Sequence, residues 1–300
     1  MLSQSNLKPK FPFISVFLLT LILITFWSAY YYNFMNGYLY VGFIMLEAIF
    51  VMILVIFFTK KPHFRKTYSV VLMILLIALV FEYRLIYQES YSHLVYGSKE
   101  PEEIVKDSGI YLLGVNTSTI YVADGLDDST IKDSYENGSG ETMLHLYPYE
   151  NKDRYNLKNE ELLSFVGLKK SDWSEMEKNV LAFLGELPNE IKPFLNEEDN
   201  YGNSAGLALV LSSLIGKGEL NNQKQIAVTG AIGPTGNVLA IGAMKEKMLI
   251  SEQYGFSYIM IPEENFIKAA EVKKEQNLNI EIIAVSHIDE ATNIISEMNN

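Results

Sequence analysis

The chain has 300 residues, a formal net charge of −12 and no cysteine. The lack of cysteine excludes disulfides, thiolate metal sites and cysteine nucleophiles. Residues 1–88 contain seven basic and two acidic residues, whereas residues 89–300 contain 17 basic and 34 acidic ones. Such an acidic part repels phosphate backbones, so we expect no nucleic-acid partner.

Residues 1–90 form a predicted transmembrane region. The first two of its three apolar runs are long enough to cross the hydrocarbon core as helices. The third reaches that length only if Glu82 and Arg84 lie at the membrane interface. We therefore expect a bundle of two to three transmembrane helices. Their approximate bounds are residues 11–32, 38–58 and 68–86.

Lysine and arginine flank these runs unevenly. Lys8 and Lys10 precede the first run, a basic cluster at residues 60–66 follows the second, and the loop between the two runs has no basic residue. Basic flanks stay in the cytoplasm, so the N-terminus is expected there. If the third run spans, the rest of the chain is expected outside the cytoplasm. If it does not, that part is cytoplasmic.

Residues 98–195 are interpreted as a strand and helix region, either separate or the start of the domain that follows. β-Branched runs predict a hairpin and a further strand, a Gly, Asp and Ser-rich stretch predicts a loop, and helical spacing predicts two helices. The hairpin is expected at residues 110–115 and 119–123, the loop at 124–141, the strand at 142–147, and the helices at 159–167 and 171–184.

From residue 196 to residue 300 strands and helices alternate, which is typical of an α/β domain. Helices are expected at residues 204–215, 244–254, 263–276 and 288–298, and strands at 225–232, 238–241, 258–261 and 280–285.

The sequence contains no motif for several kinds of enzyme chemistry. The Gly-rich stretch at residues 230–236 lacks the lysine of a phosphate-binding P-loop, so we predict no ATPase. The four histidines lack metal-ligand spacing, and His287 is expected at the start of a helix. A Ser-His-Asp triad therefore has no support here, although four histidines leave it open. We expect no metal and no cofactor.

Ser204 lies in a Gly-rich turn that opens an apolar helix. Backbone N–H groups and the helix dipole favour negative charge there, so an alkoxide or an oxyanion would be stabilised. Gly202, Asn203 and Ala205 are expected to support the oxyanion or to orient the catalytic groups, and their small size would let a peptide backbone approach closely. The competing interpretation is a serine that caps the helix.

Lys245 begins a later helix that is expected to be largely packed. Lysine becomes a general base only when burial lowers its pKa toward neutrality. Serine–lysine dyads are a known variant of triad chemistry. The competing interpretation is a solvated charge, for Lys245 and for Lys247 alike.

Taken together, residues 196–300 resemble the proteolytic domain of Lon-type Ser–Lys proteases. Five blocks in the order of that family carry the resemblance. They are residues 203–208 (Asn-Ser-Ala-Gly-Leu-Ala), 227–232 (Ala-Val-Thr-Gly-Ala-Ile), 236–247 (Gly-Asn-Val-Leu to Met-Lys-Glu-Lys), 261–265 (Ile-Pro-Glu-Glu-Asn) and 285–290 (Val-Ser-His-Ile-Asp-Glu).

The resemblance implies an α/β (α+β) Lon-protease-like domain after the membrane bundle. It implies Ser204 as nucleophile, Lys245 as general base, Thr229 as a hydrogen-bond partner of that lysine, and a homo-oligomer. Two departures stand out. The usual Asp-Gly-Pro before the serine is replaced by residues 201–203 (Tyr-Gly-Asn), and the usual Thr-Gly-Glu is replaced by residues 229–231 (Thr-Gly-Ala).

These features predict a membrane-anchored, ATP-independent serine endopeptidase that cuts unfolded or flexible protein segments. Its partners would be the membrane and a protein or peptide substrate. The two departures motivate an alternative, a catalytically silent Lon-like module that binds peptides or acts as a scaffold at the membrane.

Overall fold

The computed structural model describes residues 11–165, 167, 172–197 and 202–300. The chain divides into two compact units. Unit 1 comprises Met1–His93, Thr119–Val122 and Pro148–Val166, and unit 2 comprises Leu94–Ser118, Ala123–Tyr147 and Gly167–Asn300.

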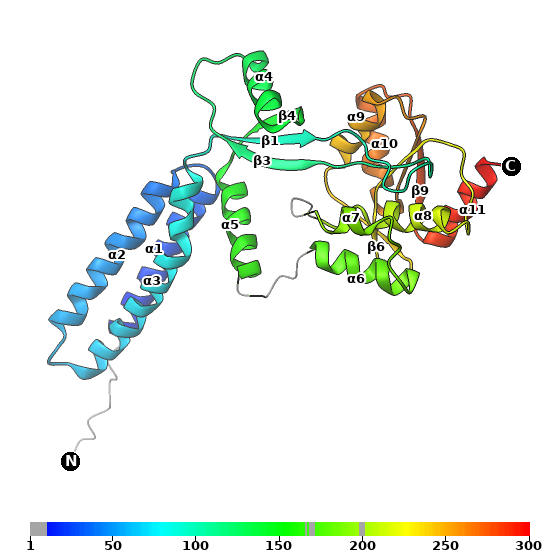
Figure 1. Cartoon of the computed structure of the whole chain (residues 1–300). Coiled ribbons are helices and arrows are strands. Elements are labelled where there is room, and N and C mark those ends of the chain that lie inside the picture. Colours follow the sequence, from blue (N-terminus) through cyan, green and yellow to red (C-terminus); the bar gives the residue numbers. More distant parts are fainter. Residues whose placement is uncertain (1–10, 166, 168–171, 198–201) are drawn as a thin grey trace. The chain divides into compact units, whose positions relative to one another are not determined.

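Unit 1 contains three helices that are long and apolar enough to cross a membrane (Figure 1). They are α1 (Phe11–Tyr31), α2 (Gly37–Phe57) and α3 (Pro62–Gln88). The bundle of two to three apolar helices predicted from sequence is thus confirmed, with three. Their shared core includes Ile44 and Tyr68, while many leucines and isoleucines on the other faces are exposed, as expected for a lipid-facing surface.

Helix α5 (Asn151–Phe165) packs against α3 through charged side chains. Lys158 Nζ donates to Glu82 Oε2 at 2.6 Å, and its ammonium lies 4.1 Å from the Tyr155 ring centroid. Arg84 pairs with Glu161 at 2.6 Å. Glu82 therefore pairs inside the unit, with a side chain only 12% exposed.

Replacing Lys158 by methionine is expected to destabilise unit 1 by about 3–5 kcal/mol, because it leaves the Glu82 carboxylate buried without its partner. The double variant Lys158→Met with Glu82→Gln removes both charges and should recover most of the loss. Denaturation of the full chain in detergent measures both variants. Equal stability of the single and double variants would contradict a buried ion pair at this place.

Unit 2 is built on a four-stranded parallel sheet in the order β2-β5-β8-β9. Side chains of successive strand residues point to opposite faces, so each strand feeds two cores. In β5, Ile226 and Val228 join one core and Ala227 joins the other. The strands are β2 (Ile110–Leu112), β5 (Ile226–Val228), β8 (Tyr258–Pro262) and β9 (Glu281–Val285).

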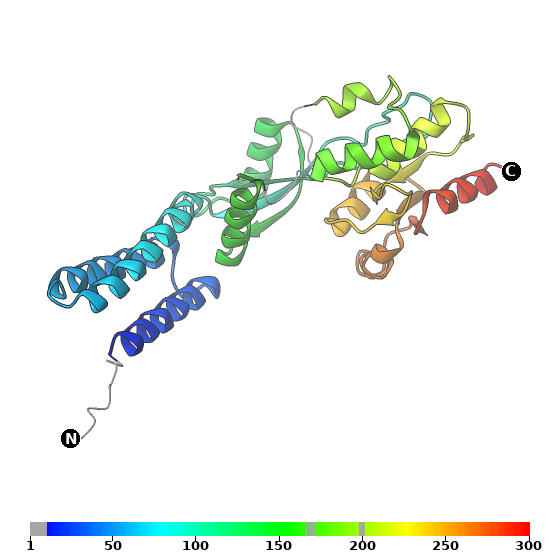
Figure 2. The same cartoon turned by 90° about the horizontal axis from the view of Figure 1, so that it is seen from below.

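Helices cover both faces of this sheet, which Figure 2 shows from below. Residues of α6, α7, α8 and α11 share one core, and residues of α9 and α10 share the other. These helices are α6 (Asp172–Leu184), α7 (Lys192–Leu195), α8 (Gly206–Gly216), α9 (Met244–Gln253), α10 (Phe266–Glu275) and α11 (Ile288–Met298), with the 3₁₀ turn η1 (Glu263–Asn265) before α10. The predicted α/β fold class is confirmed.

The remaining strands form two smaller sheets. The first has the order β3-β1-β4, and the second is the antiparallel pair β6-β7. Their bounds are β1 (His93–Ser98), β3 (Asn116–Ile120), β4 (Thr142–Pro148), β6 (Ala231–Ile232) and β7 (Val238–Leu239).

Two local predictions were wrong. The expected hairpin at 110–123 does not form, because β2 pairs with the distant β5 and β3 pairs with β1. The expected loop at 124–141 contains helix α4 (Asp128–Ser139). The Asp127 side chain accepts from the Thr130 N–H at 2.8 Å, and Gly140 ends the helix in the left-handed region. Asp and Gly are common both in loops and at the ends of helices, so composition alone does not distinguish a capped helix from a loop here.

Candidate active site

Ser204 lies in the turn that precedes α8. Its carbonyl accepts from the Gly230 N–H at 2.9 Å and from Thr229 Oγ1 at 3.4 Å. The N-cap position of α8 belongs to Ala205, not to Ser204, and it carries no side-chain cap bond. The competing interpretation of Ser204 as a helix cap is therefore wrong. Gly202, two residues earlier, has a φ of +82°, which favours glycine at the start of this turn.

The turn is held close to strand β6. A Cβ added to Gly206 would lie 2.7 Å from Ile232 Cγ2 and 3.1 Å from the Ile232 nitrogen. Glycine is therefore required at the first residue of α8 for packing, whereas the sequence had suggested only that small residues admit a substrate. This close contact fixes the position of the Ser204 backbone.

The lysine beside this turn is Lys247, not the predicted Lys245. Lys247 is 3% exposed, and its Nζ donates to Thr229 Oγ1 at 2.8 Å. Burial alone lowers the pKa of Lys247 to about 7. Thr229 Oγ1 therefore contacts both the Lys247 side chain and the Ser204 carbonyl. The expected threonine–lysine contact is present, with a different lysine.

Lys245 lies elsewhere on the same helix. It is half-buried, and its charge, after burial, is the second cause that lowers the pKa of His145 on β4. Lys245 thus faces His145 and not Thr229. The contact with Thr229 that was expected of Lys245 is therefore made by Lys247, because the two lysines lie two residues apart and consecutive residues of a helix are rotated by about 100° from each other.

The spacing of apolar residues along α9 contains a signal that distinguishes Lys247 from Lys245. Met244, Lys247, Met248 and Ser251 are spaced three and four residues apart, so they share one face of the helix. All four are buried. Because the two methionines mark that face as the packed one, a helical projection would have selected Lys247 over Lys245.

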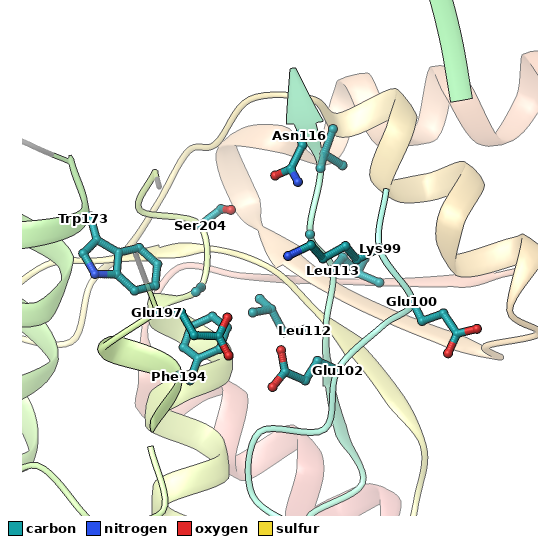
Figure 3. Close-up of a pocket in the computed structure, with 13 residues that line it drawn as sticks. Lys99, Glu100, Glu102, Leu112, Leu113, Asn116, Trp173, Phe194, Glu197 and Ser204 are labelled. Carbon is teal, nitrogen blue, oxygen red and sulfur yellow. The ribbon is translucent and has the colours of Figure 1, made fainter. Parts of the chain in front are cut away.

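A cavity of about 100 Å³ opens beside Ser204 (Figure 3). Its apolar wall includes Leu112, Phe194 and Ala205, all buried. Glu102 and Glu197 also line it, and Figure 3 shows their carboxylates turned toward each other. Ser204 thus lies at the edge of a small cavity with both apolar and acidic lining residues.

His287 takes another role. It occupies the N-cap of α11, where its Nδ1 accepts from the Asp289 N–H at 3.2 Å and its Nε2 lies 2.9 Å from the Thr235 carbonyl oxygen. The expectation that His287 starts a helix is confirmed. Both of its ring nitrogens are engaged in holding the chain.

This turn, buried lysine and bridging threonine occur in a segment with known relatives. Residues 198–297 match the sequence profile of the Lon protease (S16) C-terminal proteolytic domain. The resemblance predicted from sequence is confirmed over this segment. A Lon protease of Rickettsia bellii is 31% identical over 124 residues, 41% of this chain and 15% of the relative.

Two further Lon proteases extend the comparison. An archaeal Lon protease of Methanocaldococcus jannaschii is 34% identical over 99 residues, 33% of this chain and 14% of the relative. A Lon protease of Brucella abortus is 38% identical over 89 residues, 30% of this chain and 11% of the relative. The chain thus covers only 11% to 15% of the length of these three Lon proteases.

Proposed function

We propose that this chain is a membrane-anchored serine endopeptidase in which Ser204 is the nucleophile and Lys247 the general base. The observation that carries the proposal is the buried Lys247 amine on Thr229, whose hydroxyl also contacts the Ser204 carbonyl. Lowering a lysine pKa from 10.5 to about 7 corresponds to roughly 5 kcal/mol of desolvation. Such a cost beside the Ser204 turn is expected of a base that must be neutral to work.

The chemistry follows from that neutral amine. Lys247 accepts the Ser204 proton while Ser204 Oγ attacks the scissile carbonyl carbon. The resulting ammonium then protonates the leaving amine as the peptide C–N bond breaks. In the second half, Lys247 accepts a proton from the water that attacks the acyl ester, and its ammonium then returns this proton to Ser204 Oγ as the ester C–O bond breaks. Thr229 is a positioning residue that holds the amine.

The oxyanion of each tetrahedral intermediate needs N–H donors. Gly206 and Leu207 already donate their N–H groups to backbone carbonyls. We therefore assign the oxyanion to the backbone N–H groups of Ser204 and Ala205, with the turn at Gly202 and Asn203 setting their direction. The start of α8 thus keeps the expected role of binding the oxyanion, but only the N–H groups of Ser204 and Ala205 take part.

We propose unfolded or flexible protein segments as the substrates, cut without ATP. The 300 residues contain no P-loop motif, so a folded substrate would have to offer a loose strand unaided. Cleavage of an unfolded protein by the purified chain should be the same with and without ATP. Dependence on added ATP would contradict this part of the proposal.

The nucleophile is tested with the full chain in detergent and a fluorophosphonate probe. We expect labelling of the parent, none of Ser204→Ala, and undiminished labelling of Ser212→Ala, a buried serine in the same helix region. Cleavage of an unfolded protein should follow the same pattern. An unlabelled parent that still binds peptides would favour the catalytically silent module instead.

We further propose that the proteolytic domain lies outside the cytoplasm. Three helices of spanning length and the basic residues before α1 and between α2 and α3 support this orientation. Because the chain has no cysteine, Lys60→Cys and Glu271→Cys provide single reporters. A membrane-impermeant maleimide applied to whole cells should label position 271 and not position 60. The opposite pattern would place the domain in the cytoplasm.

Finally, we propose a homo-oligomer, on the resemblance to the Lon proteolytic domain alone. The mass of the chain in detergent, corrected for bound detergent, measures it directly. A monomeric mass in a cleavage-competent preparation would overturn this proposal without touching the Ser–Lys site.

A further inference from the structure

The segment that leads into α9 contains a strained residue. Residues 240–243 join β7 to α9 with neither helix nor strand geometry. The last of them, Ala243, is the N-cap of α9, with a φ of +54°, a ψ of +38° and no side-chain cap bond. Its carbonyl accepts from the Lys247 N–H at 3.1 Å, so Ala243 also sets where the first turn of α9 begins. Alanine rarely adopts this left-handed conformation, which persists only where the surrounding structure enforces it.

The side chain of Asn265 fixes the path of this segment. Asn265 Oδ1 accepts from the Ile241 N–H at 2.9 Å, and Asn265 Nδ2 donates to the Ile241 carbonyl oxygen at 3.0 Å. One amide side chain thus satisfies both backbone groups of a residue that lies outside the strands, as a neighbouring strand would do. Asn265 is only 8% exposed, so both bonds form in surroundings of low dielectric, where they are strong.

Both members of the Lys247–Thr229 hydrogen bond are held by strand β8. The Thr229 N–H donates to the Met260 carbonyl of β8 at 3.0 Å. Asn265 ends the 3₁₀ turn η1, which follows β8 directly, and it holds Ile241 just before α9 begins. Strand β8 therefore fixes the threonine on one side and, through Asn265, the start of the lysine's helix on the other.

We propose that Asn265 is a positioning residue that holds α9 in the rotation in which Lys247 contacts Thr229. The inference rests on the proposed function, because it concerns how the general base is aimed. Consecutive helix residues are rotated by about 100°, so a small change where α9 begins moves the Lys247 amine away from Thr229. Burial is the only cause of the low pKa of Lys247, so an amine that turns toward water regains a higher pKa.

The experiment uses the full chain in detergent and initial rates on an unfolded protein. Asn265→Leu keeps the approximate size of the side chain and removes both bonds to Ile241. We expect kcat to fall by about tenfold to a hundredfold with KM within about twofold, because a displacement of about 1 Å has effects of this size. The pH midpoint of cleavage should rise by about one unit. Asn265→Gln, which keeps the amide but displaces it, should give smaller changes in the same directions.

Asn222 provides the matched control, since its side chain also holds both backbone groups of one residue. Its Oδ1 accepts from the Lys224 N–H at 3.0 Å and its Nδ2 donates to the Lys224 carbonyl at 2.7 Å, ahead of strand β5. Asn222→Leu should lower the free energy of unfolding yet keep the parent kcat and pH midpoint. Equal changes in Asn222→Leu and Asn265→Leu, or an unchanged kcat and midpoint in folded Asn265→Leu, would overturn the inference.

A stability measurement separates this inference from the proposed function. In the Ser204→Ala chain, Lys247→Met removes a buried amine, and the stability that this adds shrinks as pH rises from about 7 to 10.5. With Asn265→Leu present, the added stability should be smaller at pH 7 and vary less with pH. If the parent cuts nothing but this difference appears, the endopeptidase proposal fails and the positioning role stands. If Lys247→Met acts alike with and without Asn265→Leu, the positioning role is overturned, whether or not the parent cuts.

Discussion

Replacing Lys247 by methionine is expected to lower peptide cleavage by about 10³-fold, whereas replacing Lys245 by methionine should leave it within about twofold of the parent. Methionine matches the length of the lysine stem and cannot accept a proton. The two lysines lie two residues apart on α9, so each variant is the matched control of the other. Initial rates on an unfolded protein substrate measure the difference.

The comparison also tests the assignment made from sequence. If Lys245→Met abolishes cleavage and Lys247→Met does not, Lys245 is the base after all. Loss of cleavage in Lys247→Met must come with an intact fold, which near-ultraviolet circular dichroism of the full chain reports.

Lys247 is expected to couple both catalysis and stability to pH. With a pKa of about 7 in the folded protein, Lys247 loses its proton through neutral pH, so cleavage should rise with pH and level off above about pH 8. At pH 5.5 the neutral fraction falls about thirtyfold below the plateau, and the rate should fall with it. Initial rates across that pH range give the midpoint directly.

The sign of the stability effect follows from the same pKa. Unfolding restores the ordinary pKa of 10.5, so the unfolded chain binds the Lys247 proton more tightly than the folded chain does. The cost of burying Lys247 is therefore complete below pH 7, shrinks as pH rises from 7 to 10.5, and vanishes above that. Lys247→Met removes this cost.

We accordingly expect Lys247→Met to be more stable than the parent by on the order of 4 kcal/mol at pH 7, and by only about 1 kcal/mol at pH 9.5. Denaturant titrations followed by the fluorescence of Trp173, which packs against Phe194 in the core of unit 2, measure the difference. Lys245→Met is the control and should show no such trend. A stability gain that stays constant or grows with pH would contradict a buried, proton-depleted Lys247.

Much of the architecture was predictable from local sequence. The three apolar runs predicted helices because length and composition alone decide whether a segment can cross a bilayer. Alternating strands and helices after residue 196 predicted the α/β fold, since periodicity and glycine stops are local signals. The Asn203-Ser204-Ala205-Gly206 block predicted a turn at the start of an apolar helix, where we propose the nucleophile.

The errors share a physical cause. Strand β2 was assigned to a hairpin because the sequence between Ile110 and Ile120 shows two adjacent β-branched runs. Its partner β5 lies more than a hundred residues later, and no local pattern specifies such a pairing. In the same way, Asp127 and Gly140 were taken for loop residues because caps and turns use the same residue types.

The choice between Lys245 and Lys247 shows most clearly where prediction from the sequence ends and the tertiary structure is needed. Sequence by itself determined the long apolar helices, the fold class, the serine turn and a short helix with two lysines. Only the tertiary structure decided which lysine is buried on Thr229 and that Glu102 meets Glu197 across a cavity beside Ser204. The reason is that desolvation and charge repulsion depend on groups brought together from distant parts of the chain, and these set a pKa and the character of a pocket.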